Sequence, residues 1–230
     1  MEGIIIFDKN EIIKNYFLKY KIDHFFNEEI IEKMKIINIK PKETLLYKGM
    51  NFEYFYFFVE GKMKIYTIEK NGKSLLLRFY NPLEILGDVE LFTSDIVKTY
   101  VDSIEKSILI AIETNYFKEY IKKNNELMIF IIQNLGRKLD SISSLSSFNL
   151  LHPLENRFAA YLKGMEDIYE NFSAETENLK EISELLGSSY RHLLRIIKKF
   201  EKNDLIKREG KKIRIINKDE INFLSKDIYE

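Results

Sequence analysis

The 230-residue sequence contains no cysteine and only three histidines. The absence of cysteine excludes disulfide bonds, thiolate zinc sites, cysteine-ligated iron–sulfur clusters and redox sensing by thiols. No histidine lies between His24 and His152, so the middle of the chain offers metal ions only oxygen ligands. These absences argue against an enzyme built on a metal-binding β-barrel, and we expect no catalytic residue, metal or other cofactor.

Long apolar runs are also missing. Runs such as Ile4–Phe7 are far shorter than the roughly 20 residues that span a bilayer. The first residues include Glu2 and lack the cationic stretch that leads a secretory signal. We therefore expect a cytoplasmic protein without a membrane partner. The 45% of apolar and 31% of charged residues are typical of a folded globular protein.

A formal net charge of zero conceals a strong asymmetry near the C-terminus. Residues 164–186 contain seven acidic residues and one lysine, a net charge of −6. Residues 187–218 contain eleven lysines and arginines against three acidic residues, a net charge of +8. A basic segment of this kind favours contact with nucleic acid.

The N-terminal half changes from a helical to a strand pattern. Residues 10–34 carry apolar side chains at helical spacing, which predicts one or two amphipathic helices that cover an end of the next domain. Short β-branched and aromatic runs then predict strands at 43–47, 54–59, 62–68, 74–80 and 99–112. Asn71-Gly72 predicts a type I′ hairpin turn and Glu60-Gly61 a second turn. We expect a helical segment over 1–34 and a compact β domain over 35–122.

A long helix is predicted over residues 123–150. Its apolar residues fall at alternating steps of three and four, the spacing of a coiled-coil seam: Met128, Ile132, Leu135, Leu139 and Ile142. A second copy of the helix is the expected partner, although the stripe could instead pack on the chain's own β domain. His152-Pro153 should end the helix, because proline disfavours helical geometry in the residue before it.

Residues 151–230 are predicted to form a winged helix-turn-helix domain. Helices are expected over 154–170 and 179–186, and Gly187 should end the second. Either Ser188 or Ser189 can cap the next helix. The apolar face of that helix is formed by Leu193, Leu194, Ile197 and Phe200. Two short strands at 205–208 and 211–216, joined at Glu209-Gly210, would form the wing.

The basic helix is expected to enter the major groove of double-stranded DNA. Arg191 and Arg195 are the main candidates for contacts to guanine, and Tyr190 lies at a further base-reading position. His192 could contact a base or a phosphate, or be an ordinary exposed histidine. Further residues are expected to contact the DNA backbone: Ser188, Ser189, Lys198, Lys199, Lys211, Lys212 and Arg214.

In the order of these parts and in several motifs, residues 35–225 resemble the Crp/Fnr family of bacterial transcription regulators. Pro41–Leu45 and Glu60–Lys64 look like the first strands of a cyclic-nucleotide-binding domain, and Leu179–Asp204 looks like the family's DNA-binding motif. Ser189–Arg195 is similar to the YeiL-like branch of the family. The resemblance implies an α+β fold with a cyclic-nucleotide-binding-type β-barrel (a double-stranded β-helix), a long dimerisation helix and a C-terminal winged helix-turn-helix.

One segment lines up with the phosphate-binding cassette of that family. The effector pocket implied by the resemblance consists of Leu86, Gly87, Asp88, Lys98, Thr99 and Tyr100. Where the family has a glutamate for the ribose hydroxyl and an arginine for the cyclic phosphate, this sequence has Asp88 and Lys98. Lysine lacks the planar fork that makes two parallel bonds to phosphate. The departures do not favour cyclic AMP and leave an unknown effector or none, and Asp88 and Lys98 could instead form a structural ion pair.

The resemblance further implies a homodimer that binds a palindromic operator, with RNA polymerase as an additional partner. A change in the barrel would reach the DNA-binding domain through the long helix and the hinge at residues 152–153. The alternative from another class is a ligand-binding adaptor whose winged helix contacts a protein, for which the acidic stretch 166–184 could serve.

Overall fold

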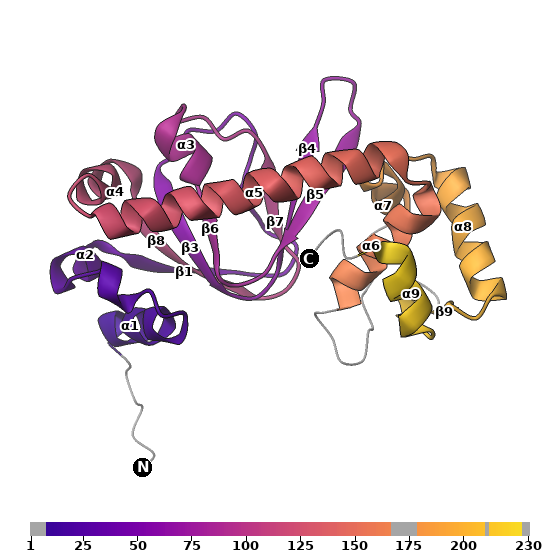
Figure 1. The fold of residues 1–230 in the computed structure, drawn as a ribbon, viewed down its shortest axis with the longest axis horizontal. Coiled ribbons are helices and arrows are strands. Elements are labelled where there is room, and N and C mark those ends of the chain that lie inside the picture. The colour runs from indigo at the N-terminus through magenta and orange to yellow at the C-terminus, as the bar shows by residue number, and fades with distance from the viewer. Residues whose placement is uncertain (1–7, 167–178, 210–211, 227–230) are drawn as a thin grey trace, which may run out of the picture. The chain divides into compact units, whose positions relative to one another are not determined.

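The computed structural model describes residues 8–166, 179–209 and 212–226, and most of its elements are labelled in Figure 1. Antiparallel sheets dominate the first half of the chain, a long helix follows, and helices with a two-stranded sheet form the C-terminal region. The predicted α+β fold is therefore confirmed. The chain divides into two compact units, residues 1–63 with 80–138 and residues 64–79 with 139–230.

Short helices precede the first strand, as the sequence predicted: α1 (Lys9–Lys19), η1 (Asp23–Phe25) and α2 (Glu28–Lys33). Asp8 and Asn27 cap α1 and α2 with their side chains. Phe17 of α1 is fully buried, and its ring lies 5.5 Å from the ring of Phe57 in the first sheet. The Tyr20 hydroxyl donates a hydrogen bond to the carbonyl of Val59 at 2.7 Å. These contacts hold the N-terminal helices on the sheet.

The first sheet has the strand order β1-β8-β3-β6, with bounds β1 (Lys35–Ile39), β3 (Tyr54–Glu60), β6 (Glu84–Leu86) and β8 (Ser107–Glu113). In the central strand β3, Phe57 pairs with Ile110 of β8 and Ile85 of β6. Every residue of β3 from Phe55 to Val59 is buried. An aromatic core therefore fixes the position of β6, from which the candidate sensor site begins.

The second sheet has the order β2-β7-β4-β5, with bounds β2 (Thr44–Leu46), β4 (Met63–Ile68), β5 (Ser74–Tyr80) and β7 (Tyr100–Ser103). The run 99–112, predicted as one strand, covers β7 and most of β8, because the chain turns between them at residues 104–106, which include the charged Glu105 and Lys106. The prediction of a type I′ turn at Asn71-Gly72, between β4 and β5, is wrong. Gly72 has a φ of +78° but Asn71 is not at positive φ, and the amide of Gly72 bonds to the carbonyl of Glu69 at 2.9 Å.

Further helices follow the sheets: α3 (Asp88–Phe92), α4 (Thr114–Ile121) and α5 (Asn125–Leu151). The side chain of Asn124 caps α5 by accepting from the amide of Leu127 at 3.0 Å. The helix ends directly before His152-Pro153, as the proline rule predicted. No helix in the described ranges is long and apolar enough to cross a membrane.

The C-terminal region contains α6 (Leu154–Glu166), α7 (Leu179–Leu185), α8 (Tyr190–Lys202), β9 (Ile206–Glu209), β10 (Lys212–Ile215) and α9 (Lys218–Ser225). In the small sheet, Ile215 pairs with Ile206 and Lys212 with Glu209. Residues 167–170 of the predicted second-domain helix lie outside the described residues. Helix α9 was not predicted, and the side-chain amide of Asn156 in α6 holds it by donating to the carbonyl of Leu224 at 2.9 Å.

Candidate nucleic-acid interface and sensor site

The turn between α7 and α8 is built by a glycine and a serine. Gly187 has a φ of +60°, and its amide donates to the carbonyl of Glu184 at 2.8 Å. The amide of Ser188 donates to the carbonyl of Ser183 at 2.8 Å. These two bonds form a Schellman motif that ends α7. Ser189, rather than Ser188, is the cap of α8, because its side chain accepts from the amide of His192 at 3.2 Å.

Helix α8 separates apolar from basic residues around its circumference. Leu193, Ile197 and Phe200 are fully buried, and the rings of Phe200 and Phe158 lie 5.6 Å apart. Leu194 is only half-buried, so it contributes less to the inner face than predicted. The exposed side chains on α8 include most of those singled out from the sequence: Tyr190, Arg191, His192, Arg195, Lys198 and Lys199. The burial of one face leaves a basic surface on the other.

The remaining candidate residues lie around this helix. Lys199 forms an ion pair with Glu155 of α6, whose two carboxylate oxygens are both 2.8 Å from its amine. Lys212 and Arg214 are exposed on β10, where they alternate with buried Ile213 and Ile215. Ser188 is half-buried in the turn. The predicted contact residue Lys211 lies outside the described residues.

Arg157 and the β4-β5 hairpin support the helix-turn-helix from within the same unit. The guanidinium of Arg157 donates to the carbonyl of Leu186 at 2.6 Å, directly before the turn. In the hairpin, the buried amine of Lys64 lies 3.0 Å from the carboxylate of Glu181 in α7. The ring of Phe79 lies 5.9 Å from that of Tyr161 in α6. Residues before and after the long helix therefore pack together around the turn.

The segment that resembles a phosphate-binding cassette links β6 to α3 and β7. Leu86 is buried at the end of β6, and Gly87 follows at a φ of +97°. A Cβ atom on Gly87 would lie 1.8 Å from the ring of Phe52, so only glycine fits here. Asp88 is 2% exposed, whereas the side chain of Lys98 is exposed to solvent. Thr99 and Tyr100 are half-buried at the start of β7.

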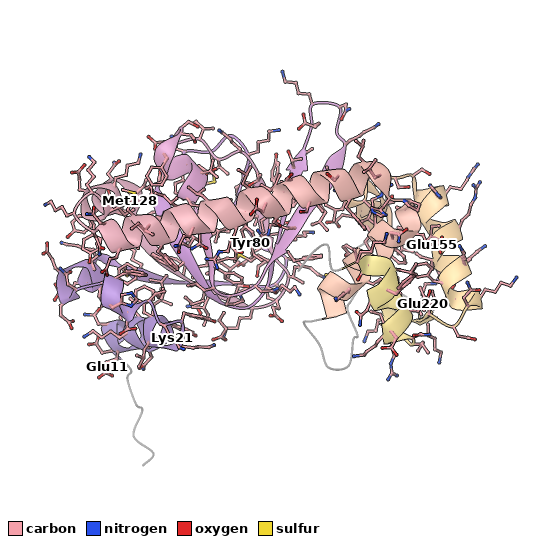
Figure 2. All side chains as sticks on the ribbon, viewed as in Figure 1. Glu11, Lys21, Tyr80, Met128, Glu155 and Glu220 are labelled. Carbon is pink, nitrogen blue, oxygen red and sulfur yellow. The ribbon has the colours of Figure 1, made fainter. Side chains whose placement is uncertain are left out.

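Asp88 belongs to a buried charge cluster that sequence reasoning did not find. Its partner is Lys138 of α5, whose amine lies 3.0 Å from Oδ1 and 2.9 Å from Oδ2 of Asp88. The same amine donates to the carbonyl of Ile85 and lies 3.8 Å from Oε2 of Glu84. The ring of Tyr80, labelled in Figure 2, lies 5.1 Å from this amine. The alternative of an Asp88–Lys98 ion pair is therefore wrong.

The cluster keeps Lys138 charged. Burial by itself would lower the pKa of this lysine, because a low-dielectric surrounding disfavours the ammonium form. Tyr80 and the carboxylates of Asp88 and Glu84 outweigh that effect and raise the pKa above its ordinary value.

In the described part of the chain, no three histidine or carboxylate groups lie close enough to hold a metal ion.

Helix α5 has an inner and an outer apolar stripe. Leu127 and Ile131, in the first unit, are fully buried. The residues predicted to face a second copy lie one position further along the chain. Ile132, Leu139 and Ile142 are 55%, 68% and 47% exposed, and Met128 and Leu135 are half-buried. The outer stripe is therefore largely exposed to solvent in the single chain, and the β domain of the same chain does not bury it.

Comparisons with known proteins identify a matching domain family and several relatives of this chain. Residues 36–124 match the cyclic nucleotide-binding domain family. The regulatory protein YeiL of Escherichia coli O157:H7 is 22% identical over 206 residues, covering 87% of this chain and 90% of YeiL. The cAMP-activated global transcriptional regulator CRP of Pasteurella multocida is 22% identical over 178 residues, covering 75% of this chain and 85% of CRP.

Solved structures show the same fold. A Crp/Fnr family protein from Eubacterium rectale superposes with a TM-score of 0.78 at 16% identity, covering 92% of this chain and 99% of that protein. A transcriptional regulator of the CRP family from Thermus thermophilus superposes with a TM-score of 0.70 at 15% identity, covering 84% and 98% of the two chains.

Proposed function

We propose that this chain is a transcription regulator of the Crp/Fnr family, and that it is a homodimeric protein that binds double-stranded DNA at a palindromic operator. The observation that carries the proposal is the two-faced helix α8. Its buried face fixes it in the domain, while Arg191, Arg195 and Lys198 are exposed on the other face. The proposal further includes that the protein acts in the cytoplasm and has no enzymatic activity.

In this proposal the N-terminal residues of α8 read bases in the major groove. Arg191 and Arg195 would donate two hydrogen bonds each to guanine, and Tyr190 would contact a neighbouring base. Ser188, Ser189, His192, Lys198, Lys199 and the wing residues Lys211, Lys212 and Arg214 would contact phosphates or flank the bases. Lys199 would first have to leave Glu155, so its contribution to affinity should be smaller than that of Lys198.

The exposed stripe on α5 supports the dimer. Ile132, Leu139 and Ile142 recur at coiled-coil spacing and are open to solvent in the single chain. Pairing with a second copy would remove this apolar surface from water. Two recognition helices would then reach major grooves roughly 34–36 Å apart, which requires an operator with two-fold symmetry.

The β domain, proposed over residues 35–122, would act as the sensor, the helix over 123–150 as the dimerisation element, and residues 151–230 as the DNA-binding domain. RNA polymerase is the proposed additional partner. The effector pocket around Leu86–Asp88 and Lys98–Tyr100 has no assigned ligand. An adaptor that contacts a protein through its winged helix is the competing function.

Selection of bound sequences from a random pool of double-stranded DNA tests the proposal. We expect the purified protein to enrich a palindrome. Arg191→Ala and Arg195→Ala should each cost about 1–3 kcal/mol and relax the base preference at one position of each half-site. Arg137→Ala, which removes an exposed arginine outside the DNA-binding domain, should leave the selected sequence unchanged. Failure to enrich any sequence, with or without added cyclic AMP, would favour the adaptor.

A further inference from the structure

The buried charge cluster includes Asp88, at the position where the resemblance to the phosphate-binding cassette places the contact to the effector's ribose. Asp88 directly follows the glycine turn and is 2% exposed. The space beside its carboxylate is filled by the ammonium group of Lys138, which contacts both carboxylate oxygens and the carbonyl of Ile85. On the other side of the turn, the ring of Phe52 packs directly against Gly87. The chain's own side chains therefore fill both sides of this turn.

The charges around the turn disfavour an anion. The carboxylates of Asp88 and Glu84 both lie beside the ammonium group of Lys138, so an anion that entered here would face two carboxylates. Burial raises the pKa of nearby Glu90, and the negative charge of Asp88 adds to that effect. Lys98, the only cation that the cassette pattern offers to a phosphate, is exposed to solvent and does not pair with Asp88. A cyclic phosphate at the position of Lys98 would therefore be held by a solvent-exposed cation, where water weakens the attraction.

We propose that Lys138 is a built-in cationic ligand of the sensor domain. Its ammonium group occupies the site beside Asp88 that a small effector would otherwise enter, and it fastens the first half of α5 to β6 and α3. The domain consequently holds this helix without a cyclic nucleotide. An effector that entered here would have to displace Lys138 and supply a positive charge for Asp88. That consequence for regulation rests on the proposed function, whereas the occupancy of the site does not.

Chemical rescue of Lys138→Ala tests the occupancy. Removal of one partner from a buried ion pair is strongly destabilising, so we expect the melting temperature to fall by roughly 6–20 °C. Propylammonium chloride supplies the deleted carbons and charge, and should recover a large part of this loss. Neither 1-propanol nor sodium chloride at the same concentration should do so. Equal recovery by 1-propanol, or none by propylammonium, would overturn the proposal.

A pair of variants covers the case in which Lys138→Ala does not fold alone. Lys138→Met should destabilise the protein strongly, whereas Lys138→Met combined with Asp88→Asn should recover much of that loss, because the carboxylate in direct contact with the lost ammonium group is then replaced by a neutral amide. Arg137→Met, one residue away and exposed, serves as the matched control and should shift the melting temperature by less than about 2 °C. Additive losses in the double variant would contradict the proposal.

Cyclic AMP distinguishes this inference from the proposed function. We expect no shift of the melting temperature of the unchanged protein with cyclic AMP in large excess, and unchanged affinity for the selected operator. A clear stabilisation by cyclic AMP would overturn the inference, even if an operator is found. A protein that selects no operator but shows propylammonium rescue would refute the proposed function and retain the built-in ligand.

Discussion

Gly87 is the residue on which the geometry of the sensor turn depends. Its φ of +97° is unfavourable for any residue with a side chain, and a Cβ atom would collide with the ring of Phe52. Because the turn directs Asp88 toward Lys138, this glycine links the aromatic core to the charge cluster.

Replacing Gly87 should therefore cost stability. For Gly87→Ala we expect a loss of about 2–5 kcal/mol in the free energy of unfolding in urea, from backbone strain and overpacking together. Gly136→Ala is the matched control, since nothing lies within 4 Å of the added methyl group in the middle of α5. This substitution should stabilise the helix by about 0.5–1 kcal/mol. Equal stability of the two variants would refute the argument.

Tyr56 predicts how stability responds to alkaline pH. Burial raises its pKa to about 12, and the neighbouring Tyr54 and Glu53 add to the shift. Above its ordinary pKa near 10, the unfolded chain loses this proton while the folded chain retains it, so the folded state is disfavoured as pH rises. We expect a loss of about 2–3 kcal/mol between pH 9 and 12 from this group. Urea unfolding of Tyr56→Phe should show a shallower dependence, and an identical dependence would contradict the assignment.

The sequence offered an ion pair between Asp88 and Lys98 as one alternative. Asp88 does form an ion pair, but its partner is Lys138. Lys98 lies ten positions after Asp88 in the cassette pattern. Lys138 lies on α5, a helix that was predicted from the coiled-coil spacing of its apolar residues. Burial of a lysine between a strand end and a helix depends on tertiary packing, and the spacing of charges along the chain carries no signal for it. The exposed face of α8 was predictable because the helical period itself separates Arg191 and Arg195 from Leu193 and Ile197.

At the scale of elements, α5 carries two neighbouring apolar stripes. The sequence pattern predicted only the one at Met128, Ile132, Leu135, Leu139 and Ile142. The other, which begins with Leu127 and Ile131, is the one the chain buries. The sequence pattern does not reveal this second stripe, because the polar residues Asn134 and Lys138, both buried, interrupt it. The short elements β6 and α3 were missed because three to five residues carry too little periodicity.

The outer stripe of α5 can be tested by a single charge. Ile132→Glu places a carboxylate in the proposed seam and should dissociate the dimer, which analytical ultracentrifugation would detect. The folded chain should be retained, as judged by circular dichroism, because this side chain is 55% exposed in the single chain. Gln133→Glu, on an exposed position one residue away, should leave the dimer intact. A dimer that survives Ile132→Glu would place the interface elsewhere.

At the scale of the whole molecule, the proposed dimer doubles every contact with the DNA backbone. Lys212 lies on the wing and is exposed, so Lys212→Ala should weaken binding to all sequences alike. Because a dimer loses two phosphate contacts, the slope of log affinity against log salt should decrease by about 2. Fluorescence anisotropy at several salt concentrations measures this slope. A change of base preference instead would show that Lys212 reads sequence.

The hairpin β4-β5 limits how such proteins can be recombined. A chimera joined at residues 152–153 would transfer the helix-turn-helix without residues 64–79. Tyr161 would then lose the ring of Phe79, and Glu181 would lose the amine of Lys64. The grafted domain would present an apolar surface in place of these contacts, which favours aggregation. A functional exchange of DNA-binding specificity should therefore transplant the hairpin together with the reading head, or confine the replacement to the exposed face of α8.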